Sequence, residues 1–150
     1  MTDWIYCGSD PPVDADGTQS LLRTHQAIWC SPPGLRPWPG IPAVADRIWL
    51  VWRNGAGGSI LLLGSGRLAA NTQPRFGTNL LHTTSDIPGV RDAAKQLGYG
   101  GGLSMSFLRV QEVAFPAVGH PAVAGLGAIP NALSEASEAQ SAILDGMLRV

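Results

Sequence analysis

The sequence predicts an α+β domain built on a curled, mostly antiparallel β-sheet that closes into a barrel and carries flanking helices. Short runs of β-branched and aromatic residues alternate with Gly- and Pro-rich turns, which is typical of a sheet. The two strongest runs are joined by a glycine-rich turn, which predicts a hairpin. Few residues are left for parallel crossovers, so a doubly wound sheet is disfavoured. The 150 residues fit one domain, spanning 1–150, with one core.

In the first third of the chain, the run Trp4–Cys7 is aromatic and β-branched and ends at a turn, so it predicts a strand. Apolar residues at helical spacing predict a short helix over Thr18–Ile28, with Thr18 as its cap. Residues 31–42 hold five prolines and two glycines, which predicts an irregular loop around Trp38.

The middle of the chain predicts the hairpin. Its strands are Arg47–Arg53 and Ser59–Leu63, and the second strand resumes at Gly66–Ala70. The glycines at 64 and 66 predict a bulge or sharp bend of the type that curls a sheet into a barrel.

The last third predicts two helices and a strand. The helices span Ser85–Gly98 and Ser134–Leu148, and Ser134 is the expected cap of the second. Between them, Leu103–Phe115 predicts a long strand whose alternation breaks near Gln111.

Composition and charge restrict the function classes. Charged residues make up 14% of the chain and hydrophobic residues 45%, so the chain is expected to fold. The net charge of −1 removes the large positive field of many nucleic-acid-binding proteins, although a local basic patch is still compatible. Lys95 is the only lysine among ten basic residues. Arginine is the better bidentate donor to phosphates and base edges, but a GC-rich bacterial gene gives the same bias.

The cysteines and histidines do not predict a metal site. Cys7 and Cys30 are isolated thiols, expected to be small buried hydrophobes in a reducing cytoplasm. With His25 they would still lack a fourth ligand, because His82 and His120 are isolated in the sequence. No run of the sequence approaches the ~20 apolar residues that span a bilayer, and the N-terminus lacks the pattern of a signal peptide. We therefore expect the protein in the cytoplasm, with no membrane partner.

The sequence contains no complete catalytic or cofactor-binding motif. Residues 60–69 match the dinucleotide-binding pattern of a strand followed by G-x-G-x-x-A. In that motif the glycine-rich turn must be followed by a helix, but Pro74 would end any helix here within about two turns. We therefore expect no dinucleotide, or any other cofactor. A G-x-S-x-G elbow and a histidine with a recognisable catalytic partner are both missing. The domain is therefore expected to bind rather than catalyse.

Five tryptophans stand out. Trp49 and Trp52 differ by an odd number of positions in one strand, so they face opposite sides, and we expect one of them at a pocket or rim. Trp29 and Trp38 lie in or beside turn-rich segments, where they are candidates for aromatic walls that stack on a planar base. Core and lid packing is the equally weighted alternative for each tryptophan.

Two segments resemble the EVE domains of the PUA-like superfamily, which also contains the YTH and ASCH domains. Trp4–Pro11 is similar to their opening tryptophan strand followed by Ser-Glu-Pro, here with Asp for Glu and one extra residue before the serine. Ala45–Arg53 is similar to their Gly-Asp-x-hydrophobic strand, with Ala45 where the family often has glycine, and Ser59–Ala70 to the strand that follows. The Pro-rich loop around Trp38 has no counterpart.

The resemblance implies a five- or six-stranded barrel whose cleft receives a modified or flipped-out base of DNA or RNA. By matching position it implies Ser9 and Asp10 as polar groups at the pocket edge. Arg53, Arg67 and Asn71, at the ends of the hairpin strands, are candidates for contacts with backbone or ligand. Two other classes remain open, namely a small-molecule or nucleoside binder or hydrolase using the same cleft, and a protein-interaction module. The sequence does not indicate the oligomeric state.

Overall fold

The fold was analysed in a computed structural model, which describes residues 1–9, 15–30, 42–53, 59–70, 106–117, 119, 121–130 and 132–149. The elements in chain order are β1 (Asp3–Ser9), α1 (Ala15–His25), β2 (Ala27–Cys30), β3 (Arg47–Arg53), β4 (Ile60–Leu68), β5 (Ser106–Ala114), β6 (Ala122–Val123), β7 (Ala132–Glu135) and α3 (Glu138–Arg149). The predicted helix over 85–98, most of the Pro-rich loop and residues 103–105 of the predicted strand lie outside the described residues.

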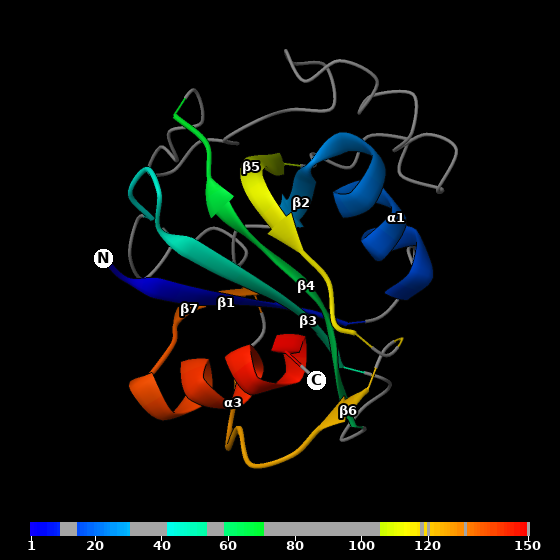
Figure 1. The fold of residues 1–150 in the computed structure, drawn as a ribbon, viewed down its shortest axis with the longest axis vertical. Coiled ribbons are helices and arrows are strands. Elements are labelled where there is room, and N and C mark those ends of the chain that lie inside the picture. The colour runs from blue at the N-terminus through cyan, green and yellow to red at the C-terminus, as the bar shows by residue number, and fades with distance from the viewer. Residues whose placement is uncertain are drawn as a thin grey trace.

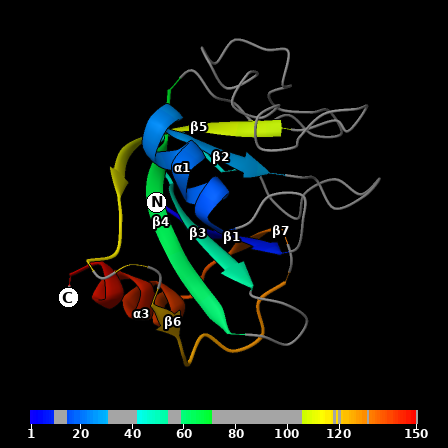
Figure 2. The same ribbon diagram turned by 90° about the vertical axis from the view of Figure 1, so that its right-hand side faces the viewer.

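The seven strands form one mixed, open sheet in the order β2-β5-β4-β3-β1-β7, with β6 pairing onto β4 beyond the end of β5. Among these strands only β1 and β3 pair in parallel, so the predicted α+β class and mostly antiparallel sheet are confirmed. The long strand β4 bends between β6 at one end and β5 at the other, which curves the sheet (Figures 1 and 2). The β1–β3 pairing was not predicted.

The predicted hairpin is confirmed, because β3 and β4 are antiparallel neighbours from Arg53 paired with Ile60 to Arg47 paired with Arg67. The register shifts once, where Leu50 pairs with Gly64 but Val51 pairs with Leu62, so one extra residue bulges out of β4 beside the predicted glycine. The G-x-G segment is therefore part of a paired strand rather than a phosphate-binding turn.

The glycine at position 64 is needed for close approach. A Cβ placed there would lie 2.8 Å from Leu22 Cδ2 of α1 and 2.9 Å from the carbonyl oxygen of Ala114 in β5. The β5 strand has its own irregularity, because Ser65 pairs with Ala114 and Arg67 with Gln111, which confirms the break predicted near Gln111. The bulge holds Glu112 at a φ of 50°. Both bulges lie where the sheet bends around α1.

Hydrophobic cores cover both faces of the sheet. The α1 face buries Trp4, Ile48 and Trp52 with Leu22 of the helix, and the α3 face buries Ile5, Val51 and Trp49 with Leu144 of the helix. Of the predicted pocket or rim position for Trp49 or Trp52, the rim is wrong, since the two side chains are 0% and 5% exposed. They do face opposite sides, but each side has its own covering layer, which the strand pattern alone could not reveal.

The helix predicted over Thr18–Ile28 is shifted. It begins at Ala15, so Thr18 is a buried helix residue rather than a cap. It ends at His25, and Gln26 takes a φ of 52° while its N–H donates to the carbonyl of Leu22. This turn ends the helix, and Ile28 then lies in β2, where β-branched and aromatic residues pair with β5.

The C-terminal helix also begins later than predicted. Ser134 is not its cap, because residues 132–135 form β7 and pair with β1, and Leu133 enters the α1-face core. The cap is Ser137, whose Oγ accepts from the N–H of Gln140 while the Gln140 side chain accepts from the N–H of Ser137. This reciprocal capping box fixes the start of α3.

Two further expectations can be compared with the described residues. Cys7 is a buried free thiol, as predicted, and His25, the third group of the rejected metal site, is partly exposed on α1. Neither helix in the described part of the chain is long and apolar enough to cross a bilayer.

Candidate ligand-binding site

The carboxyl ends of β1 and β3 bring together two residues predicted for the site. The parallel register pairs Ser9 with Arg53, although these residues are far apart in the sequence. Asp10 follows Ser9 directly and lies outside the described residues. The carboxyl ends of adjacent parallel strands meet at one edge of a sheet, where open α/β sheets bind their ligands, and β1 and β3 are the one described pair of this sheet with that arrangement. This edge is therefore the candidate ligand-binding site.

The Arg53 side chain is fixed against the protein at this edge. Its Nη2 donates a hydrogen bond of 2.8 Å to the carbonyl oxygen of Ile129, and the guanidinium lies beside the buried thiol of Cys7. Burial raises the pKa of the Cys7 thiol, while the charge of Arg53 and its hydrogen bond act in the opposite direction and do not offset burial. The thiol is therefore protonated at neutral pH, and Arg53 is the charged group available at the edge.

Arg67 lies at the opposite end of the hairpin. It pairs with Arg47 at the start of β3, and the seven residues of β3 separate it from Arg53 by about 20 Å. Its Nε forms an ion pair with Glu112 at 3.0 Å, and its Nη1 donates to the carbonyl of Ala45 at 3.1 Å. Arg67 therefore joins the turn before β3 to the bulge in β5, and it does not share a small-ligand site with Arg53.

Of the three remaining predicted site residues, the structure describes only one. Trp29 lies in β2, opposite Phe107 of β5, and three strands separate β2 from β1 in the sheet order. Trp38 and Asn71 lie outside the described residues. The described structure thus joins Ser9 with Arg53, and assigns Arg67 to another part of the sheet.

Sequence analysis missed the role of Asp46. Its Oδ2 accepts from Trp4 Nε1 at 3.0 Å and from the N–H of Ala43 at 2.9 Å, and its Oδ1 accepts from the N–H of Thr2 at 3.2 Å. Burial opposes the charged form, but these three donors, together with the positive charge of the N-terminus, outweigh burial and hold the pKa of the Asp46 carboxyl below its ordinary value. The sequence signal for this role was the Ala45-Asp46 pair, which the sequence analysis used only to mark the start of a strand.

Comparison of the chain with known protein families, with characterised proteins and with solved structures gives no match. Among the residues that the structure describes, no three His, Cys, Asp or Glu side chains lie close enough together to hold a metal ion. At the edge where Ser9 pairs with Arg53, the described side chain that can contact a ligand is the fixed Arg53 guanidinium.

Proposed function

We propose that this chain is a PUA-like, EVE-type binding domain that recognises a modified or flipped nucleobase of DNA or RNA without catalysing a reaction. The observation that carries the proposal is the register pairing of Ser9 with Arg53. A guanidinium supplies fixed, planar donors for a phosphate or a base edge, and Ser9 with the following Asp10 supplies the polar edge groups that the family resemblance implies.

A second observation supports the EVE-type assignment. Ala45 occupies the position where EVE domains often have glycine, and it adopts a φ of 74°, which is a conformation that favours glycine. The neighbouring Asp46 accepts three hydrogen bonds that tie this turn to the first strand. The Gly-Asp motif therefore has a backbone role that this chain fulfils with Ala-Asp. The curved β4 is compatible with the barrel that the proposal includes.

The charge of the chain restricts how a nucleic acid would bind. With a net charge of −1, we expect modest affinity and a shallow salt dependence from about two or three phosphate contacts, rather than six to ten. Trp38 and Trp29 remain the proposed stacking residues, but Trp29 lies in β2, which three strands separate from β1, so it would contact a different nucleotide from the one at Ser9 and Arg53. Arg67 is a weaker candidate because Glu112 and Ala45 engage it, and Asn71 remains a candidate. Base recognition, rather than charge, would then supply most of the selectivity.

The experiment is a fluorescence titration at low salt with oligonucleotides that carry plain or modified bases. Arg53→Gln should weaken binding about tenfold, because it removes one charge-assisted contact. Arg23→Gln is the matched control, since Arg23 lies on α1 and stacks on Phe115, away from the edge. A protein that binds no oligonucleotide, or an Arg53→Gln variant that binds like the control, contradicts the proposal.

The same titration separates stacking from edge recognition. Replacing Trp29 or Trp38 by alanine should weaken all base-containing ligands together, by about 1–3 kcal/mol per lost stack. Asp10→Ala should instead change which base is preferred, because it leaves one edge donor of the ligand without a partner. Equal binding by both tryptophan variants and the wild type would remove these residues from the site.

A further inference from the structure

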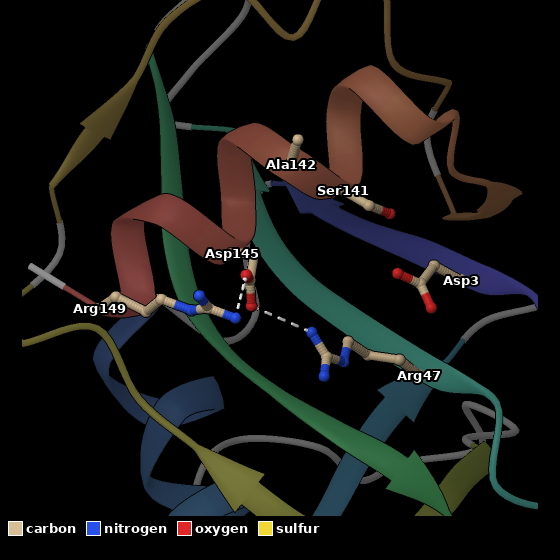
Figure 3. Close-up of a pocket in the computed structure, with 6 residues that line it drawn as sticks. All are labelled: Asp3, Arg47, Ser141, Ala142, Asp145 and Arg149. Carbon is tan, nitrogen blue, oxygen red and sulfur yellow. Dashed lines mark hydrogen bonds and ion pairs between the residues drawn. The ribbon is translucent and has the colours of Figure 1, made fainter.

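A second candidate site lies at the opposite end of β1 and β3, under the face of α3. It is an open pocket of about 300 Å³ between the helix and the amino ends of the two strands (Figure 3). Its lining residues are Asp3, Arg47, Ser141, Ala142, Asp145 and Arg149. The length of β3 separates this pocket from Arg53, so it is distinct from the proposed base site.

Two arginines are held side by side in this pocket by one carboxylate. Asp145 Oδ2 binds Arg149 Nη2 at 2.8 Å, and Asp145 Oδ1 binds Arg47 Nη1 at 3.3 Å. The Arg47 guanidinium also lies over the Trp49 ring, 5.0 Å from its centroid, and its side chain is only 26% exposed. Arg47 is therefore pre-oriented, and a guanidinium with five N–H donors has others to offer besides the one that Asp145 accepts.

One lining residue, Ser141, has a buried polar atom without a partner, and so does Trp49, which lies under Arg47. Among the described residues, Trp49 Nε1 and Ser141 Oγ are the only buried side-chain nitrogen or oxygen atoms that make no hydrogen bond. Ser141 lines the pocket, and Trp49 lies beneath Arg47. An indole N–H and a hydroxyl can both donate, and leaving such donors unsatisfied costs stability, so each one calls for an explanation such as a bound molecule. Of the two, Ser141 lines the pocket, so its hydroxyl is the group for which a ligand in the pocket would supply a partner.

The charges around the pocket restrict which acceptor fits. Arg47, Asp145 and Arg149 form one side, while Asp3 and the Ser141 side chain lie on the other (Figure 3). Asp145 already pairs with both arginines, so this side of the pocket carries one net positive charge, which matches a single carboxylate rather than a doubly charged phosphate. A ligand that also carries an ammonium group would satisfy Asp3. The volume is at the small end of the range for ligand pockets, which favours a compact molecule.

We propose that this pocket binds a small zwitterion of the free α-amino acid class. The carboxylate accepts from Arg47 and Arg149, the ammonium donates to Asp3, and the Ser141 hydroxyl supplies a further hydrogen bond. The inference does not depend on the proposed nucleobase site, because the two sites share no residue.

The test is an NMR titration of the full chain with glycine, with acetate and with methylammonium as separate probes. Glycine should bind with a Kd of about 1 mM and shift the amide signals of Ser141 and Asp145, while each single-charge probe binds about tenfold more weakly. Absence of glycine binding overturns the proposal. Equal binding of acetate and glycine also overturns it, because the site would then recognise only an anion.

Variants assign the two charges of the ligand. Arg149→Gln should weaken glycine and acetate alike by about tenfold, and the fold should tolerate it because this side chain is 77% exposed at the end of α3. Asp3→Asn should weaken glycine about tenfold and leave acetate no weaker. Arg23→Gln is the control that should bind like the wild type. Glycine binding that is unchanged in Arg149→Gln or in Asp3→Asn contradicts the assignment.

Discussion

Trp4 and Trp49 are two buried tryptophans on neighbouring strands, and their indole N–H groups have opposite environments. Trp4 faces α1 and donates to Asp46 at 3.0 Å, whereas Trp49 faces α3 and has no acceptor among the described residues. Both rings are packed with comparable completeness, so the difference lies in hydrogen bonding rather than in burial. The buried indole N–H on the α1 face therefore has a hydrogen-bond acceptor within the chain, whereas the one on the α3 face has none among the described residues.

The largest effect is expected at Asp46. Asp46→Ala leaves the Trp4 N–H and two backbone donors without their acceptor, which should cost about 3 kcal/mol or more. Because the folded pKa lies below the ordinary value of about 3.9, the carboxylate stabilises the fold above that pH, and this contribution is lost as pH falls through the folded pKa. The difference in the free energy of unfolding between the wild type and the variant should therefore decrease from pH 6 to pH 3. Urea unfolding at several pH values measures it, and a constant gap would contradict this role.

A matched pair of substitutions tests the comparison directly. Trp4→Phe and Trp49→Phe remove similar volume from the two cores, but only the first removes a hydrogen bond to a charged group. We expect Trp4→Phe to cost about 2 kcal/mol more than Trp49→Phe, measured by thermal or urea unfolding. Equal losses would mean either that the Trp49 N–H has a partner after all or that the Trp4 bond contributes nothing.

The smallest effect is expected at Ala45, next to Asp46. Ala45 has a φ of 74°, where a Cβ is unfavourable, so Ala45→Gly should stabilise the domain by about 1 kcal/mol. Replacing Ala27, a buried alanine of β2, by glycine is the control and should destabilise. A destabilised Ala45→Gly variant would indicate that the Ala45 side chain contributes packing that outweighs the backbone strain.

Much of the fold could be predicted because strand signals in this chain are local. The hairpin, the first strand and the register break near Gln111 follow from alternation and glycine placement within short windows. The helix starts could not be predicted, because Thr18 and Ser134 resemble caps in sequence while Ser137 is the serine that makes the reciprocal bonds. Burial of both Trp49 and Trp52 depends on helices that cover both faces, which is a tertiary property.

The candidate sites were less predictable than the fold. The pairing of Ser9 with Arg53 depends on the parallel β1–β3 register, and nothing local to either residue specifies that register. The pocket beneath α3 had a partial signal in the sequence, since Asp145 and Arg149 are spaced for an i,i+4 ion pair on a helix. The involvement of Arg47 could be found only once the helix was placed over the strand.

The parallel contact between β1 and β3 also has a consequence for the order of folding. Trp4 and Asp46 are 42 residues apart in the sequence, whereas the paired residues Arg53 and Ile60 are separated by only a few residues. Closing the first contact therefore costs roughly 1.5 kcal/mol more in chain entropy. We therefore expect the hairpin to form early, as a local nucleus, and β1 to dock after it. The Asp46 hydrogen bonds with Thr2 and Trp4 then form late, so their loss should accelerate unfolding far more than it slows folding. The Asp46 carboxylate would therefore slow the unfolding of the domain.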